Sequence, residues 1–172
     1  MTDLGPCSYY LGMTVTWDRV NRTLRLGQAA YVERFLRHHG MWGQSLLQPQ
    51  WKPRPGFCQL KTGTWHHQLK QYQSAVGSLM YAMLGTRPDI AYTVSVVSRY
   101  SLNPTAKHFG AVKGIFRYLR STIHWQLTYK GSLESLTGWT DSDWAGNHGT
   151  RKSTSGYVFN LGSGAISWSS KR

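Results

Sequence analysis

Acidic residues are scarce in this sequence. Seven Asp and Glu stand against 20 Lys and Arg, which gives a formal net charge of +13. So few carboxylates exclude most mechanisms that need paired acids, because only one close pair, Asp141 and Asp143, occurs. The positive excess extends along the whole chain and favours a polyanionic partner. Nucleic acid is the first candidate, and an anionic membrane surface or an acidic protein is the alternative.

Cysteine and long apolar runs are also lacking. The two cysteines, Cys7 and Cys58, are far apart and form no Cys-x-x-Cys motif, so we expect reduced structural thiols. No apolar run approaches the length of a membrane-spanning helix. The first residues lack the basic and apolar regions of a secretory signal. These absences predict an intracellular protein with no membrane partner.

Several catalytic motifs are absent as well. There is no Gly-rich phosphate loop, nucleophile elbow or Cys–His pairing in its required context. The adjacent histidine pairs, His38–His39 and His66–His67, do not have the spacing with which regular structure presents two imidazoles to one metal. We therefore expect them on the surface or in loops.

Apolar residues recur with two different periods along the chain. A period of two predicts a hairpin over 11–26, and a helical period follows over 29–36. Residues 44–71 lack a sustained period and contain three prolines, which indicates a connector. Helical spacing returns over 75–84 and after Asn103–Pro104, whereas 90–100 is compatible with a helix or a strand.

From residue 123 the period returns to two, and Gly- and Ser-rich turns separate the later strands. The predicted fold class is α+β, with an N-terminal β-hairpin, a helical bundle and then an antiparallel β-meander. We divide the chain into a hairpin and helix (1–43), an irregular connector (44–71), a helical region (72–122) and the meander (123–172).

The close acidic pair ends one of the predicted strands. Residues i and i+2 project from the same face of a strand, roughly 7 Å apart, so Asp141 and Asp143 have the spacing to share a divalent metal. The alternative is turn chemistry or a solvated strand end. Residues 144–172 contain no Asp or Glu, so nothing downstream completes a ligand set.

Three basic residues, Lys113, Arg117 and Arg120, recur at helical spacing beside the apolar stripe of the helix after Asn103. They predict either a solvated helix face or a stripe that faces phosphates, and the sequence alone leaves both open.

Several segments together resemble the Pol polyprotein of copia-type long-terminal-repeat retrotransposons, across the junction of reverse transcriptase and ribonuclease H. The matching segments, in chain order, are Asp3-Leu4-Gly5 with Tyr10-Leu11-Gly12-Met13, Leu24-x-Leu26-x-Gln28-x-x-Tyr31-Val32, Tyr72-x-x-x-Val76-Gly77-Ser78-Leu79-Met80-Tyr81, Thr86-Arg87-Pro88-Asp89-Ile90, Arg117-Tyr118-Leu119, Gly138 to Gly146 and Arg151 to Tyr157.

The resemblance implies a role for each region. Tyr10, Leu11, Gly12 and Met13 match the primer grip, and the helical region resembles the thumb, which implies that Lys113, Arg117 and Arg120 contact phosphates. The final strands resemble the start of a ribonuclease H domain with Asp141, and Asp143 as a second candidate, at a Mg²⁺ site. Template–primer duplex or RNA–DNA hybrid is the implied partner, in the cytoplasm or a virus-like particle, with the nucleus as an alternative.

The chain also departs from the family pattern. It contains no Asp-Asp pair, which the polymerase site requires, and the remaining ribonuclease H carboxylates would follow Arg172. Met1 resembles an internal methionine. We therefore expect a fragment that holds nucleic acid, is inactive alone and does not bind Mg²⁺ tightly. The alternatives are an active enzyme completed by missing polyprotein segments and a host-adopted protein-interaction module.

Overall fold

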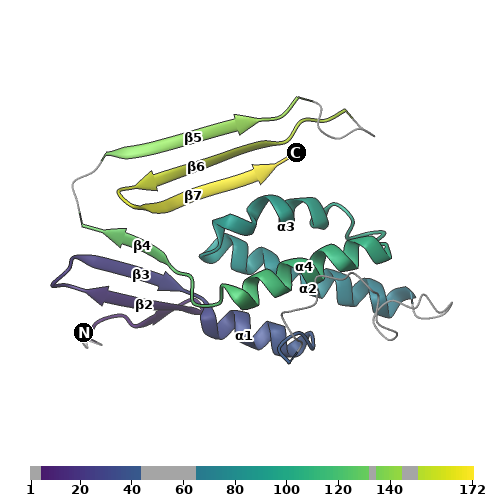
Figure 1. The fold of residues 1–172 in the computed structure, drawn as a ribbon, viewed down its shortest axis with the longest axis horizontal. Helices are drawn as coiled ribbons and strands as arrows, with labels where there is room; N and C mark the ends of the chain where they lie inside the picture. The colour runs from purple at the N-terminus through teal and green to yellow at the C-terminus, as the bar shows by residue number, and fades with distance from the viewer. Residues whose placement is uncertain (1–4, 44–64, 132–134, 145–150) are drawn as a thin grey trace.

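Two antiparallel sheets and a group of helices form the fold (Figure 1). The computed structural model describes residues 5–43, 65–131, 135–144 and 151–172. The first sheet has the strand order β1-β2-β3-β4, and the second has the order β5-β6-β7. The strands are β1 (Tyr9–Tyr10), β2 (Met13–Asp18), β3 (Thr23–Gly27), β4 (Leu127–Lys130), β5 (Leu136–Ser142), β6 (Ser155–Leu161) and β7 (Gly164–Lys171).

The helices pack their apolar faces together and enclose the hydrophobic core. They are α1 (Ala29–His38), α2 (Trp65–Gly85), the short 3-10 helix η1 (Pro88–Ile90), α3 (Ala91–Ser98) and α4 (Ala106–Ser121). Every helix contributes fully buried residues, such as Leu36, Leu79, Val94 and Leu119. The phenol of Tyr72, also in this core, donates a hydrogen bond to the carbonyl of Val97 at 2.7 Å. This core agrees with the helical region expected from the sequence.

The structure changes or decides the sequence expectation for three of the helical segments. Helix α2 begins at Trp65, inside the stretch predicted as a connector, and residues 44–64 lie outside the described residues. Residues 88–98 are helical, which settles the choice between helix and strand there. Helix α4 starts after Thr105, whose backbone N–H donates to His108 Nδ1 at 2.9 Å. The first turn is therefore capped by Thr105, two residues after Asn103.

Strand β4 lies in the first sheet, although its residues belong to the segment 123–172 that the sequence assigned to the meander. Leu127 pairs with Leu26, and Tyr129 pairs with Leu24, so β4 continues the face of the N-terminal hairpin. The period-two pattern after residue 123 predicted a strand correctly. The pattern could not predict which strand β4 pairs with, because the pairing with β3 requires α4 to bring the chain back to the hairpin.

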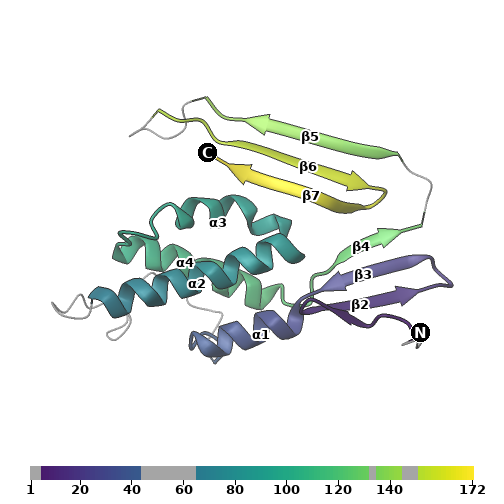
Figure 2. The same ribbon diagram turned by 180° about the vertical axis from the view of Figure 1, so that it is seen from behind.

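The second sheet stands beside the helices and contacts them through β7, as Figures 1 and 2 show. Trp168 of β7 donates its indole N–H to the carbonyl of Met83 in α2 at 2.9 Å. The phenol of Tyr129 donates to the carbonyl of Ala165 at 2.6 Å, which joins the two sheets. Every residue of β5, the strand farthest from the helices, is exposed.

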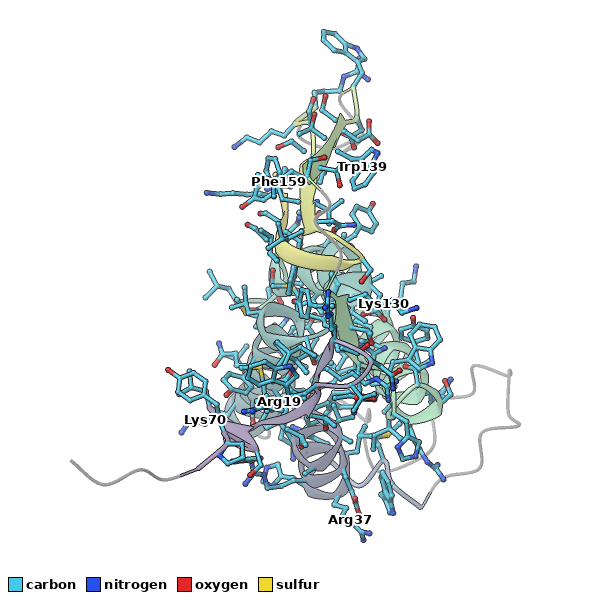
Figure 3. The ribbon with its side chains drawn as sticks, turned by 90° about the vertical axis from the view of Figure 1, so that its left-hand side faces the viewer. Arg19, Arg37, Lys70, Lys130, Trp139 and Phe159 are labelled. Carbon is cyan, nitrogen blue, oxygen red and sulfur yellow. The ribbon has the colours of Figure 1, made fainter. Side chains whose placement is uncertain are left out.

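The two faces of this second sheet both carry exposed aromatic side chains. Successive residues of a strand point to opposite faces, and Trp139 pairs with Val158 whereas Phe159 pairs with Gly138. Figure 3 accordingly shows Trp139 and Phe159 on opposite sides of the sheet. A Cβ atom at Gly138 would come within 2.4 Å of the Phe159 ring, so glycine lets this ring lie over β5.

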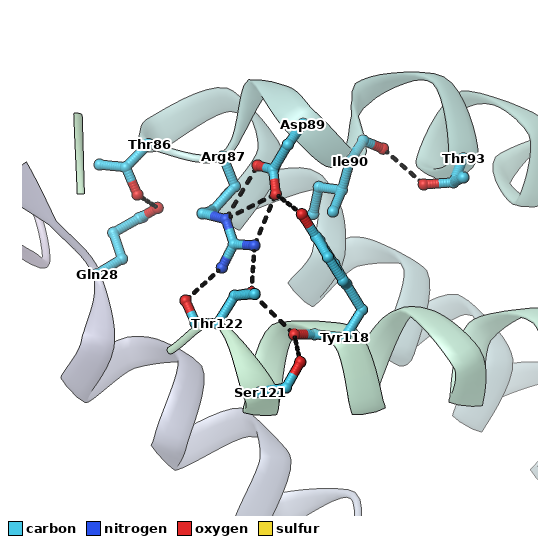
Figure 4. A network of polar contacts seen from close by, with 9 residues as sticks. All are labelled: Gln28, Thr86, Arg87, Asp89, Ile90, Thr93, Tyr118, Ser121 and Thr122. Atoms are coloured by element: carbon cyan, nitrogen blue, oxygen red, sulfur yellow. Dashed lines mark hydrogen bonds and ion pairs between the residues drawn. The ribbon is translucent and has the colours of Figure 1, made fainter. Parts of the chain in front are cut away.

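A buried arginine connects the end of α2 to the end of α4 (Figure 4). Arg87 is 3% exposed and forms an ion pair with Asp89 at 2.7 Å. It also donates to the carbonyl of Thr122 at 3.1 Å and to the Thr122 hydroxyl at 2.6 Å. The Tyr118 phenol donates to the same Asp89 oxygen, Oδ2, at 2.8 Å. These contacts satisfy a charge that would otherwise be costly to bury.

A protonation effect follows from the same network. Burial acts to raise the pKa of Asp89, but hydrogen bonds from Arg87 and Tyr118 and the charge of Arg87 outweigh it, and the pKa lies below its ordinary value of 3.8. A carboxyl whose pKa is lowered by folding stabilises the protein above the unfolded-state pKa. This stabilisation is lost as the pH falls through the folded-state pKa.

Replacing the buried arginine tests both effects. We expect Arg87→Met to lower the free energy of unfolding by about 3 kcal/mol at pH 7, because it leaves the Asp89 carboxylate without its ion-pair partner. Urea unfolding at pH 7 and pH 3 measures this loss, which should be smaller at pH 3. The exposed Arg117→Met on α4 is the control and should change stability by less than about 0.5 kcal/mol. Equal losses at the two pH values would contradict the linkage.

The exposed outer strand β5 leads us to predict self-association of the protein. Trp139 is 57% and Leu136 is 60% exposed on β5, an edge strand within the described residues. Exposed apolar edges promote association, and a lysine on such an edge opposes it. We expect Trp139→Lys to reduce oligomer formation at high protein concentration, measured by sedimentation velocity. Val20→Lys, at a 92% exposed position in the turn between β2 and β3, is the control. An unchanged oligomer fraction in Trp139→Lys would reject this edge as the association surface.

Candidate nucleic-acid interface

The segment Tyr10 to Met13 forms a tight two-residue hairpin turn. Tyr10 pairs with Met13, and the two central residues, Leu11 and Gly12, have φ angles of 46° and 75°. Two positive φ angles are typical of the type I′ turns that match the twist of hairpin strands. A left-handed conformation costs a residue with a side chain about 1–2 kcal/mol. The conformation of Leu11 therefore needs support from the surrounding structure.

Helix α2 supplies that support through Tyr81. The Tyr81 phenol donates a short hydrogen bond to the carbonyl of Leu11. A Cβ atom at Gly12 would lie 3.2 Å from the Tyr81 hydroxyl oxygen, so the turn and the phenol are in close contact. The centres of the Tyr81 ring and the Tyr31 ring of α1 are 4.7 Å apart. The Tyr31 phenol donates a hydrogen bond to the carbonyl of Ser78 at 3.2 Å. The turn is thus fixed to two helices.

The outer surface of the turn remains open to solvent. Tyr9, Tyr10 and Leu11 are 58%, 60% and 64% exposed. A hollow of about 530 Å³ beside the turn is lined by Gly12, Tyr31, Arg34, Gly77, Ser78 and Tyr81. Burial raises the pKa of Tyr31, which keeps its phenol a neutral donor. The turn therefore presents aromatic and apolar groups next to one cation, Arg34.

The predicted basic stripe lies on α4, but its three members differ in environment. Arg117 is exposed, whereas Lys113 and Arg120 are half-buried. The Arg120 guanidinium lies 5.9 Å from the centre of the Trp42 ring, and Arg37 of α1 lies 4.9 Å from the same ring. Arg120 therefore helps to hold Trp42, and Arg117 is the member best placed for an external anion.

Helix α1 connects the turn and the stripe. Tyr31 of α1 packs against Tyr81, which holds the turn. The guanidinium groups of Arg37 and Arg120 both lie over the ring of Trp42. Sequence reasoning did not assign a role to Tyr31 or Tyr81 in the site. Both belong to the segments that carry the family resemblance, but the contacts of Tyr81 with Tyr31 and with Leu11 join residues far apart in the chain.

The acidic pair lies at the far end of β5, as the sequence predicted. Both carboxylates are exposed, and Asp141 accepts a hydrogen bond from the N–H of Ser142 at 2.8 Å. The Asp143 carboxylate accepts a short hydrogen bond from the N–H of Thr154, and the Asp143 N–H donates to the Thr154 carbonyl at 3.0 Å. Asp143 is thus held to Thr154, the residue immediately before β6.

A magnesium site does not fit the described residues around Asp141. The hollow there, about 550 Å³, has Asp141 as its single carboxylate and also contains Lys171. Two-metal sites need several oxygen ligands, and a lysine ammonium disfavours a second cation. Over the described ranges, no group of three or more His, Cys, Asp or Glu has metal-binding proximity. The same ranges contain no helix long and apolar enough to span a membrane.

Curated proteins match the chain over nearly its whole length. The chain is 44% identical over 179 residues to the retrovirus-related Pol polyprotein from transposon TNT 1-94 of Nicotiana tabacum, covering 99% of this chain and 13% of that protein. It is 38% identical over 165 residues to the Pol polyprotein from transposon RE1 of Arabidopsis thaliana, covering 95% of this chain and 11% of the relative.

A shorter relative matches most of its own length. The uncharacterized mitochondrial protein AtMg00810 of Arabidopsis thaliana is 37% identical over 174 residues, covering 100% of this chain and 70% of that protein. No protein-family model matches the chain, and no solved structure matches it. The chain thus spans about an eighth of the two Pol polyproteins. From these matches, the chain is homologous to a segment of retrovirus-related Pol polyproteins from copia-type transposons.

Proposed function

We propose that the chain is the part of a reverse transcriptase and ribonuclease H polyprotein that holds template–primer duplex or RNA–DNA hybrid. In this proposal, the turn from Tyr10 to Met13 is the primer grip, helix α4 belongs to a thumb-like region, and β5 to β7 open a ribonuclease H-like domain. The similarity to the Pol polyprotein from transposon TNT 1-94 supports the proposal.

The clamped turn is the observation that carries the proposal. A grip must hold a primer end at a defined position, which requires a rigid backbone. The left-handed Leu11 and Gly12, the Tyr81 hydrogen bond to Leu11 and the packing of Tyr81 on Tyr31 supply this rigidity. Because the turn is already ordered, binding does not have to compensate for loss of its conformational freedom.

The charge distribution supports a duplex partner. A net charge of +13 favours a polyanion, and the exposed Arg117 on α4 is positioned to contact a phosphate without breaking a described ion pair. Phosphate contacts of this kind position a duplex without reading its sequence. We therefore expect binding to hybrid duplexes of different sequence with similar affinity.

Substitutions on the turn and on α4 test this binding. We expect Tyr10→Ala to weaken binding to an RNA–DNA hybrid by about fivefold or more, since an aromatic contact contributes ~1 kcal/mol or more. We expect Arg117→Gln to reduce the slope of log affinity against log salt by about 0.9. Fluorescence anisotropy with the full chain and a labelled hybrid measures both.

Two matched variants serve as controls for this experiment. Tyr92→Ala removes a tyrosine on α3 that is 59% exposed, close to the 60% of Tyr10, and Lys70→Gln removes an exposed cation on α2. Neither should change hybrid affinity as much as its counterpart. Binding that does not depend on salt, or losses equal to those of the controls, would favour the host-adopted protein-interaction module instead.

We also propose that the chain is inactive alone, because the described surroundings of Asp141 provide one carboxylate and a lysine. Purified chain with Mg²⁺ and an RNA–DNA hybrid, or with template–primer and nucleotides, should show no turnover. Turnover that Asp141→Ala abolishes would refute this and establish an active enzyme. Activity that appears only after addition of the missing polyprotein segments would instead show that these segments complete the site.

A further inference from the structure

A row of large side chains crosses the first sheet at the end opposite the Tyr10–Met13 turn. Trp17 pairs with Leu24, and Leu24 pairs with Tyr129, so the three lie side by side on one face of β2, β3 and β4. Trp17 is 62% exposed, whereas Leu24 and Tyr129 are half-buried. The row therefore offers an exposed indole next to a partly covered apolar floor.

Cations surround this row. A hollow of about 720 Å³ is lined by Trp17, Leu24, Tyr129, Arg19, Arg22 and Lys130, together with Gly131, and none of these residues is acidic. The Arg19 guanidinium lies 4.8 Å from the centre of the Trp17 ring. Arg19 and Lys130 are both labelled in Figure 3. The hollow thus combines an aromatic platform with three positive charges.

The nearest acidic residue in the sequence does not neutralise these charges from within the hollow. Asp18 follows Trp17 in β2, so its side chain points to the opposite face of the sheet. Its carboxylate accepts hydrogen bonds from the backbone and side-chain nitrogens of Asn21, at 3.0 and 2.6 Å. These bonds shape the β2–β3 turn, which carries Arg19 and Arg22.

The backbone around the hollow is also fixed. Arg22 has a φ of 48°, and its carbonyl accepts a hydrogen bond from the Gly131 N–H at 2.7 Å. A Cβ atom at Gly131 would lie 2.9 Å from the Cβ of Arg22, so only glycine allows this approach. The Tyr129 phenol is held by the carbonyl of Ala165 in β7. Both walls of the hollow are therefore preorganised.

We infer that this hollow binds single-stranded nucleic acid, with an unpaired base stacked on Trp17 and the adjoining phosphates held by Arg19, Arg22 and Lys130. The hollow is complementary to such a strand, because an exposed indole stacks on a base and the cations neutralise the backbone. A duplex offers phosphates but keeps its bases stacked inside, so it does not use the indole.

The site is separate from the proposed primer grip. Strand β2 runs from Met13, next to the grip turn, to Asp18, next to the hollow, and a strand rises ~3.3 Å per residue, so about 17 Å separates the two. The inference goes beyond the proposed function: it adds a contact for a strand outside the duplex. It does not depend on the assignment of Tyr10 to Met13 as a primer grip.

Oligonucleotide binding by the full chain tests the inference. We expect Trp17→Ala to weaken binding of a single-stranded decanucleotide by roughly 5- to 150-fold, because stacking of a base on an aromatic ring contributes that much. Trp17→Phe should retain much of the affinity. Arg19→Gln should reduce the slope of log affinity against log salt by about 0.7. The wild-type chain should also show quenching of tryptophan fluorescence that Trp17→Ala diminishes.

Matched controls separate this site from the rest of the surface. Trp139→Ala removes a tryptophan of similar exposure, 57%, from the other sheet, and Lys70→Gln removes a cation from α2. Both should keep wild-type affinity for the single strand, and circular dichroism should show all variants folded. Equal losses in Trp17→Ala and Trp139→Ala would overturn the inference.

A crossed comparison separates failure of this inference from failure of the proposed function. Trp17→Ala should leave binding to a blunt RNA–DNA hybrid unchanged, and Arg117→Gln should weaken that binding. If the hybrid results hold while Trp17→Ala does not alter single-strand binding, the single-strand site is wrong and the duplex role stands. Binding of anionic phosphatidylserine vesicles that requires Trp17, without such a requirement for the oligonucleotide, would also overturn the inference.

Discussion

The arrangement of both sheets depends on the buried guanidinium of Arg87. It joins Asp89, which follows α2, to Thr122, at the end of α4, and the rings of Tyr118 and Trp125 lie 5.4 and 5.7 Å from it. The chain enters β4 just after this point, so the position of the α4 end determines how β4 meets β3. Strand β4 then contacts β7 through Tyr129. One charge, neutralised by local partners, thus orients the connection between the helices and the two sheets.

The geometry of the grip-like turn depends on the same helices. Leu11 keeps its left-handed backbone because Tyr81 of α2 holds its carbonyl, and Tyr81 rests on Tyr31 of α1. At the start of α1, Gln28 accepts a hydrogen bond from the buried Thr86 hydroxyl at 2.9 Å, immediately before Arg87. The segment from Thr86 to Asp89 therefore supports the turn as well as β4. A substitution there is expected to act on binding through position, not through direct contact.

Local patterns in the sequence predicted the elements, and distant contacts decided their partners. The amphipathic spacing in α1 and α4 and the alternation in β2 and β3 are local signals, and the predicted elements are present. Three contacts join residues far apart in the chain: the pairing of β4 with β3, the hydrogen bond between Tyr81 and Leu11, and the row from Trp17 to Tyr129. Local periodicity in the sequence cannot predict such contacts. The spacing of Asp141 and Asp143 could be read from the sequence, but the hydrogen bonds that their carboxylates accept from backbone N–H groups could not.

The two sheets differ in how firmly other elements hold them. The groups proposed for nucleic-acid binding and the candidate metal ligand lie on different sheets. The first sheet carries the clamped turn at one end and the basic aromatic hollow at the other, and both are braced by other elements. The second sheet is joined to the helices through β7, and Asp141 lies two strands away on the exposed β5. Catalysis by metal ions needs ligands fixed within a fraction of an ångström. Binding through phosphates and stacked rings tolerates more freedom, and the groups proposed for it lie on the sheet that other elements hold in place. The groups that we propose for nucleic-acid binding are therefore held by several elements, whereas Asp141 lies on the exposed outer strand.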